Sequence, residues 1–355
     1  MSFASASAGT IAATSLRTLR AEFTDSHGYL AACTAGLPMT ATRTAVMGDL
    51  LGRPDPVHYG RVAEAARASF AQLIGSPVTR VAIGSQTSVF VAMIAASLPD
   101  GAEVVCPDDE FSSLVLPFVH AGRGIHVRTA PLTELAASIG PQTTLVAYSL
   151  VQSACGSIAD VNAIADAATA VGARTLCDVT QAAGWLPVDA TRFDAVVCHA
   201  YKWLCAPRGV AFLSVEPSLA EQLRPVNAGW YAGSDPWASC YGVEARLAED
   251  ARRFDVSPAW QAFVGAEPAL RLFADADMSA VRDYTTALAR EFRARLGVEG
   301  HDSAIVSWLD PDGAALARLT SAGVTASGRN GRARVAFHVF NDESDVDRAA
   351  RALGC

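Results

Sequence analysis

The chain has 355 residues, 51% of them hydrophobic and 18% charged, which excludes a disordered protein and allows a large buried core. The formal net charge of −8 argues against a nucleic-acid partner. Of the 28 basic residues, Lys202 is the only lysine and the rest are arginine. Arginine can replace lysine in salt bridges, but it cannot lose its proton and attack a carbonyl. The residues around Lys202 must therefore show whether the single lysine results from compositional drift or is kept for a chemical role.

The eight cysteines are scattered, without a CxxC pair or a Cys/His cluster. This pattern favours reduced, buried thiols in a cytoplasmic protein that has no metal site. Residues 1–20 lack the apolar core of a signal peptide, and although they weakly resemble a transit peptide, a frayed or helical N-terminus is favoured. The uncharged stretches 81–99 and 135–159 contain Gly, Ser, Gln or Pro, so we expect buried strand–loop–helix units and no membrane partner.

From residue 80 onward, short apolar runs alternate with helical patterns. The predicted strands cover 80–83, 103–106, 125–128, 144–149, 174–178, 193–199 and 210–215. The predicted helices cover 87–98, 111–121, 133–138, 161–171 and 217–223. This alternation predicts an α/β fold with a mostly parallel seven-stranded sheet covered by helices. Because no full helix separates the last two strands, one of them is expected to be an antiparallel insertion.

After about residue 275 the pattern changes. A helix over 279–296 leads to a strand at 304–308, a helix at 312–321, a strand at 332–338 and a helix at 343–353. We therefore expect three parts: a segment 1–25 that packs on the small domain, a large domain 26–274, and a small α+β domain 275–355.

Three of the predicted strands end at or next to residues that could bind a ligand or take part in a reaction. After strand 80–83, Gly84 allows a tight turn, and the N–H groups of Ser85, Gln86 and Thr87 can form an anion site at a helix N-terminus. Strand 174–178 ends in Asp178, and Lys202 follows strand 193–199 among aromatic and apolar residues. Each feature alone also has an ordinary structural interpretation as a helix cap or a core residue.

Together the three features predict a site for pyridoxal phosphate. The carboxyl ends of neighbouring strands meet at one edge of the sheet. A lysine for the aldehyde, a carboxylate for the ring nitrogen and a helix N-terminus for the phosphate are what this cofactor requires. Desolvation lowers the pKa of a lysine and frees its amine for Schiff-base chemistry.

Residues 174–215 resemble the signature of class V aminotransferases, the branch of fold-type I pyridoxal phosphate enzymes that includes cysteine desulfurases, kynureninases and isopenicillin N epimerase-like proteins. The core of the signature is Asp178-x-x-Gln181 followed by Lys202-Trp-Leu. The resemblance extends from about residue 28 to the C-terminus and is weakest before residue 75. It implies the fold-type I architecture and an internal Schiff base at Lys202.

The resemblance also implies roles for individual residues. Lys202 and Asp178 would be the catalytic pair, the lysine moving the α-proton and the carboxylate facing the ring nitrogen. Gln181 and Ser153 would lie near the phenolic oxygen, and Phe111 would stack on the ring. The phosphate contacts would come from Ser85, Gln86, Thr87, His199 and Tyr201, with Gln86 in place of the usual small hydroxyl residue.

Further residues implied by the resemblance lie later in the chain. Arg334 would bind the substrate carboxylate, with Arg329 and Arg332 close enough in sequence to share the task. Ser257 and Trp230 match positions that reach the cofactor of the neighbouring subunit. The resemblance thus implies a homodimer with active sites at the subunit interface and an amino acid as the small-molecule substrate.

The reaction itself stays open at this point. The loop 324–332 before Arg334 has no cysteine, and Cys355 is remote, so a persulfide mechanism is disfavoured. We expect an aminotransferase first and a lyase second, either C–S eliminating or kynureninase-like, with an epimerase behind them. A cofactor-free binding module is the non-enzymatic alternative. A short-chain dehydrogenase is disfavoured, because Tyr201 and Lys202 are adjacent and the glycine-rich dinucleotide turn is absent.

Overall fold

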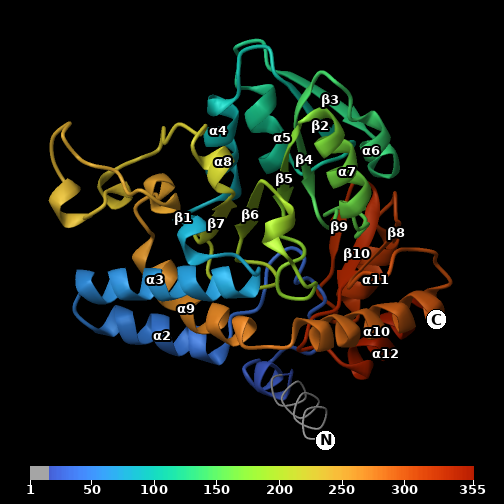
Figure 1. Ribbon diagram of the computed structural model, residues 1–355. Coiled ribbons are helices and arrows are strands. Elements are labelled where there is room, and N and C mark those ends of the chain that lie inside the picture. Colours follow the sequence, from blue (N-terminus) through green and yellow to red (C-terminus); the bar gives the residue numbers. More distant parts are fainter. Residues whose placement is uncertain (1–15) are drawn as a thin grey trace, which may run out of the picture.

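A seven-stranded sheet forms the centre of the large domain in the computed structural model, which describes residues 16–355 (Figure 1). Its strands run in the order β1-β7-β6-β5-β4-β2-β3. Their bounds are Val81–Gly84 (β1), Glu103–Pro107 (β2), His126–Ala130 (β3), Thr143–Ser149 (β4), Arg174–Asp178 (β5), Ala195–His199 (β6) and Ala211–Val215 (β7). Only β7 runs antiparallel to its neighbours β1 and β6. The mostly parallel α/β sheet and its single antiparallel insertion are confirmed.

Helices cover both faces of this sheet, as alternation of side chains along each strand requires. One face packs against α4 (Thr87–Ser97), α5 (Ser112–Val119) and α8 (Pro217–Ala220). The other packs against α3 (Pro56–Leu73), α6 (Leu135–Ser138), α7 (Val161–Val171) and α9 (Trp260–Ala274). A further helix, α2 (Thr40–Leu51), lies along α9, where Thr42 donates a hydrogen bond to the Gly265 carbonyl (2.8 Å).

Local signals in the sequence explain where these helices begin and end. The Asp160 carboxylate caps α7 by accepting a hydrogen bond from the Ala163 N–H (3.0 Å), and Gly172 ends the helix in a left-handed conformation (φ 73°). Helix α3 begins at Pro56, directly after its N-cap residue Asp55. Proline lacks a backbone N–H, but at the first position of a helix that group has no partner within the helix.

The C-terminal residues form a smaller α+β domain with its own apolar core. Its three-stranded antiparallel sheet has the order β8-β10-β9, built from Ile305–Leu309, Arg332–Ala336 and Ser327–Arg329. Its helices are α10 (Met278–Leu296), α11 (Ala314–Ser321) and α12 (Glu343–Leu353). The small C-terminal domain expected from the sequence is confirmed, whereas the short strand β9 was not predicted.

Residues 28–31 pair with the small domain although they lie near the start of the chain. The Leu30 N–H donates to the Thr325 carbonyl (2.8 Å), and the Ala336 N–H donates to the Leu30 carbonyl (2.8 Å). Just before them, the Arg20 guanidinium donates to the Tyr284 hydroxyl (2.7 Å) on α10. Residues 1–15 of the expected N-terminal segment lie outside the described residues, and the domain boundaries at 25 and 274 stay predictions.

Within residues 16–355, none of the helices is both long enough and apolar enough to cross a membrane.

Candidate active site

The carboxyl ends of several strands meet around one cavity. Across β4 and β5, Ser149 pairs in register with Asp178, and His199 ends the next strand, β6. Nine of the thirteen residues predicted from the sequence line this cavity: Gln86, Thr87, Phe111, Ser153, Asp178, Gln181, His199, Tyr201 and Lys202. The expected convergence of strand ends thus occurs in the fold.

Lys202 is buried, with 5% of its surface exposed, and no hydrogen bond or ion pair to its amine is found in the described part of the chain. Its Nζ lies 5.0 Å from the centre of the Phe111 ring and 5.8 Å from that of Tyr201. Burial, together with the positive charge of Arg334, lowers the pKa of Lys202 to about 8, although Asp178 opposes the shift. About half of the amine is therefore unprotonated at pH 8 and free to attack a carbonyl.

The backbone of Lys202 is fixed from outside the sheet by residues close to the N-terminal pairing segment. The Gly36 N–H donates to the Tyr201 carbonyl (2.8 Å). A Cβ on Gly36 would lie 2.1 Å from the Lys202 carbonyl oxygen, so only glycine permits this approach.

Asp178 ends β5 inside the cavity and is 5% exposed. Its Oδ1 accepts a hydrogen bond from the Thr180 N–H (2.8 Å), and the Thr180 hydroxyl oxygen accepts one from the His199 N–H (2.9 Å). Burial raises the pKa of Asp178 to about 6, against the opposing influence of Thr180 and Lys202. A cationic ring nitrogen placed beside this carboxylate would offset its desolvation.

Two buried polar atoms beside the cavity have no hydrogen-bond partner within the described residues: Thr87 Oγ1 and His199 Nε2. Thr87 is the first residue of α4, and Gln86 before it makes no side-chain capping bond. Desolvation, with Arg208 and Lys202 nearby, lowers the pKa of His199 to about 4, so its ring is neutral. The positive end of a helix and two unused polar atoms fit an anionic group such as phosphate.

Arg208 extends this anion-binding side of the cavity. Its guanidinium carbon lies 4.2 Å from the centre of the Tyr201 ring, and the Tyr201 ring packs edge-on against His199 with 4.4 Å between ring centres. The sequence analysis missed Arg208. A search for a second cation in the turn between the two strands that flank Lys202 could have found it.

Phe111 is held by a buried carboxylate that the sequence analysis also missed. Glu110 accepts hydrogen bonds from the Phe111 N–H (2.7 Å), the Ser149 N–H (2.8 Å) and hydroxyl (2.6 Å), and the Gln152 side-chain amide (2.9 Å). These four bonds tie the loop that carries Phe111 to the end of β4. Phe111 itself lines the cavity and stays 40% exposed.

Gln181, Ser153 and Arg334 form a connected group. The Gln181 side-chain amide donates to the Ser153 hydroxyl (3.0 Å) and to the Cys33 carbonyl (2.8 Å). Arg334, 1% exposed, donates to the carbonyl and hydroxyl of Ser153 and to the Thr34 hydroxyl (3.0 Å). It forms no ion pair with a carboxylate in the described chain, so its charge is available to an anionic ligand.

The other arginines near Arg334 point elsewhere. Arg332 donates to the hydroxyl and the carbonyl of Ser307 on β8, and Arg329 donates to the Gly328 carbonyl (2.7 Å). Of the three arginines that the sequence brought together, only Arg334 contacts a residue that lines the cavity.

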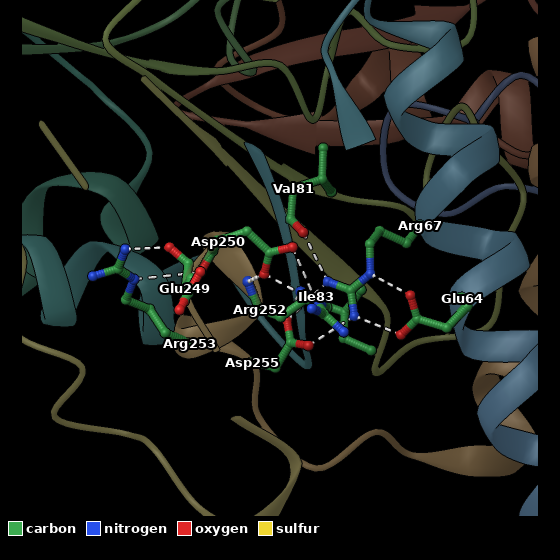
Figure 2. Close-up of polar contacts among 9 residues, drawn as sticks. All are labelled: Glu64, Arg67, Val81, Ile83, Glu249, Asp250, Arg252, Arg253 and Asp255. Carbon is green, nitrogen blue, oxygen red and sulfur yellow. Dashed lines mark hydrogen bonds and ion pairs between the residues drawn. The ribbon is translucent and has the colours of Figure 1, made fainter. Parts of the chain in front are cut away.

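Ser85, Trp230 and Ser257 do not line this cavity. Ser85 is half-buried next to it in the chain, Trp230 borders a separate cavity, and Ser257 is exposed. Figure 2 shows how the segment before Ser257 is anchored: Asp255 accepts hydrogen bonds from Arg67 on α3 and from the Ile83 N–H on β1 (2.8 Å). Four further lining residues were missed from the sequence: Ser88, Ser113, Ser149 and Thr180.

The residues of this cavity fit pyridoxal phosphate. They provide a buried amine with a lowered pKa, an anion cradle with two unused polar atoms, and a buried carboxylate. The fold and this cavity together are those of an α/β enzyme that uses a phosphorylated aldehyde cofactor.

A family model, that of class-V aminotransferases, matches residues 57–307. The chain belongs to the class-V aminotransferase family, and its cofactor is pyridoxal phosphate.

Curated relatives of this chain carry several different activities. Isopenicillin N epimerase of Streptomyces clavuligerus is 33% identical over 46% of this chain and 46% of its own length. An uncharacterized aminotransferase of Bacillus subtilis, YcbU, is 28% identical over 81% of both chains. Kynureninase of Deinococcus radiodurans is 31% identical over 63% of this chain and 57% of its own. The matched region thus spans about half the length of the epimerase and of kynureninase.

A solved structure described as the cystine C-S lyase C-DES superposes with a TM-score of 0.83 at 18% identity, over 92% of this chain and 97% of that one. At this identity the likeness extends to the fold alone. It confirms the fold-type I architecture.

Proposed function

We propose that this protein is an aminotransferase that acts on an amino acid. The observation that carries the proposal is the environment of Lys202, the one buried and unpaired amine in the cavity, beside Phe111. Bound pyridoxal phosphate supplies an electron sink for the bonds at the substrate Cα. Lys202 would act as the base that removes the Cα proton and as the acid that returns it, so that a single side chain could serve transamination.

The remaining residues bind and orient the reactants. Asp178 would pair with the ring nitrogen, Phe111 would stack on the ring, and Gln181 would lie near the phenolic oxygen. Gln86, Thr87, His199 and Tyr201 would hold the phosphate, and Arg208 would supply a positive charge beside it. Arg334 binds the substrate carboxylate, which would replace its hydrogen bonds to Ser153 and Thr34.

Epimerisation is the third candidate, and it would need a second proton-transferring group in the cavity besides Lys202. Inverting Cα needs a base on one face and an acid on the other. The other titratable side chains of the cavity are a carboxyl with a raised pKa, a neutral histidine and Tyr201.

A lyase is the second candidate, and the kynureninase relative is the observation that favours it. The Tyr201-Lys202 pair and the Gly229-Trp230-Tyr231 segment resemble that branch of the family. A lyase would use the same lysine and the same cofactor, so the products separate the two proposals.

The deciding experiment mixes the loaded enzyme with a panel of amino acids and follows absorbance and products. An aminotransferase converts the bound cofactor to its amine form and releases the matching oxo acid. Pyruvate with ammonia or sulfide, or alanine from kynurenine, would instead identify a lyase. If every amino acid in the panel gives neither of these results, both candidates are refuted. Lys202→Ala is the matched control and is expected to abolish every one of these signals.

We also propose a homodimer. Ser257 is exposed and lies outside its own cavity, as expected if it contacts the cofactor of a second subunit. Trp230 likewise lies outside the lysine cavity and lines a separate one.

A further inference from the structure

A second cavity lies apart from the lysine site, where the start of α3, the loop after Trp230 and the start of α9 meet. It has a volume of about 220 Å³. Its walls are mainly aromatic and apolar: Trp230, Tyr231, Trp237, Trp260, Pro56, Pro236, Gly60 and Gly233. Three charged residues complete the lining, namely Glu64, Arg252 and Asp255.

The aromatic rings are set at different angles around this space. The rings of Trp230 and Trp237 lie 5.0 Å apart at 37°, and Tyr231 stands nearly perpendicular to Trp230 (88°, 5.2 Å). Trp260 is fixed from behind by stacking on Tyr59, with 4.8 Å between ring centres. A cavity bounded by several non-parallel tryptophan and tyrosine rings is suited to a cation, because the ring faces carry negative electrostatic potential.

The charges beside the rings leave a negative surplus. Arg67, 1% exposed, pairs with two carboxylates at once, Glu64 (2.9 Å) and Asp255 (2.7 Å). The remaining lining cation, Arg252, is paired with Asp250 (2.9 Å). Figure 2 shows these groups side by side. Two carboxylates on one guanidinium leave one net negative charge next to the aromatic walls.

The net negative charge beside the rings requires that the Asp255 carboxyl is ionised. Burial raises the pKa of Asp255 to about 6 even with Arg67 beside it, so the carboxyl is ionised at pH 8. The surplus charge is therefore present under mildly alkaline conditions.

Each oxygen of the Glu64 and Asp255 carboxylates already accepts a hydrogen bond from Arg67, and this bears on the kind of cation that the cavity would bind. Both Glu64 oxygens accept hydrogen bonds from Arg67 (3.0 and 2.9 Å). Both Asp255 oxygens accept from Arg67 as well (3.0 and 2.7 Å). A primary ammonium would have to share these acceptors with Arg67 to replace its water, whereas a quaternary ammonium has no N–H groups to satisfy.

We propose that this cavity binds a quaternary ammonium group, such as a trimethylammonium head, against the aromatic walls that Trp230, Trp237 and Trp260 form. The site holds its ligand by cation–π attraction and by the unbalanced carboxylate charge. The proposal does not depend on which reaction takes place at Lys202, although it shares Trp230 with the proposed contact to the cofactor of a second subunit.

The test is calorimetric titration of the cofactor-loaded protein at pH 8 with three small probes. Choline carries the trimethylammonium head, 3,3-dimethylbutan-1-ol has the same shape without charge, and ethanolamine is a primary ammonium. We expect saturable binding of choline, about tenfold tighter than that of the neutral alcohol, with ethanolamine weaker than choline. Equal binding of choline and the alcohol, or no binding of choline, would overturn the proposal.

Three variants locate the site. Trp237→Leu keeps an apolar side chain but removes a ring face, and Glu64→Gln keeps the shape but removes the surplus charge. Each is expected to weaken choline binding several-fold. Tyr241→Leu is the matched control, because Tyr241 lies on the same loop, is 93% exposed and does not line the cavity. Unchanged choline affinity in both Trp237→Leu and Glu64→Gln, with circular dichroism showing that they fold, would place the cation elsewhere and refute the assignment.

Discussion

Lys202 costs the folded protein stability before the cofactor binds. An exposed lysine has a pKa near 10.5, but burial holds that of Lys202 at about 8. Between these two values the unfolded chain binds more protons than the folded chain, so the free energy of unfolding rises with pH across this window. Below pH 8 the penalty is roughly 3 kcal/mol.

The lowered pKa can be measured directly, because the chain has a single lysine. Peptide mass spectrometry can follow how fast an acylating reagent modifies Lys202 in the cofactor-free protein. We expect this rate to rise with pH, with a midpoint near pH 8. The α-amino group of the chain labels on a different peptide and serves as an internal reference. Asp178→Asn should move the midpoint further down, since the carboxylate supports the charged amine. A midpoint near 10.5 would contradict the buried environment.

At the residue scale, the sequence predicted the groups that end strands. Asp178 and His199 are the last residues of β5 and β6, and Lys202 follows directly, so the strand pattern was enough to bring them together. Glu110 could not be found in this way, because its role depends on Ser149 and Gln152, about forty positions away in the chain. Arg208 could have been found from its place in the turn after Lys202, but its contact with the Tyr201 ring is visible only in the folded protein.

At the scale of elements, the buried ion pair between Arg67 and Asp255 joins three parts of the large domain. Arg67 lies on α3 and also donates to the Val81 carbonyl on β1 (2.7 Å), while Asp255 belongs to the segment that leads to Ser257. Both side chains are 1% exposed. Breaking such a pair leaves one charge buried without a partner.

We expect Arg67→Met to lower the free energy of unfolding by about 3–5 kcal/mol, measured by urea denaturation at pH 8. Arg271→Met, which removes the exposed pair with Glu267 (3.2 Å), is the control and should cost less than about 1 kcal/mol. The double variant Arg67→Met with Asp255→Asn should recover part of the loss. Equal effects of the two single variants would show that burial does not govern this pair.

The elements that were predicted and those that were missed differ in their side chains. All seven strands were found to within two residues at each end, because short apolar runs between turn residues are distinctive. Helices α2, α3 and α9 were not predicted. The buried face of α3 includes several alanines, such as Ala63 and Ala66, so its apolar periodicity is faint.

At the scale of the whole molecule, an apolar strip on α2 lacks a partner within the described chain. Met47, Leu50 and Leu51 are 63%, 69% and 88% exposed, and their spacing puts them on one side of the helix. Next to the strip is an apolar cavity of about 500 Å³ that includes Tyr201 and Arg208, which also line the lysine site. A second subunit seated here would reach the cofactor cavity.

We therefore expect the protein to be a dimer in solution and Leu51→Glu to shift it toward monomer, measured by light scattering after size exclusion. Cofactor affinity should fall with the loss of the dimer, since the cavity of each subunit would lose its neighbour. Leu309→Glu is the matched control, because Leu309 is 74% exposed on the small domain. A wild-type monomer that retains the cofactor would contradict the proposed assembly.

The pairing of residues 28–31 with the small sheet has a mechanical consequence. Ala31 bridges to Ala336 in the small domain, and Gly36 is bonded to the Tyr201 carbonyl beside the lysine. The few residues between them can span only about 17 Å even when fully extended. This short tether allows little independent rotation, so any rigid-body movement of the small domain pulls on the peptide that carries Lys202, unless one of its two anchor points breaks first.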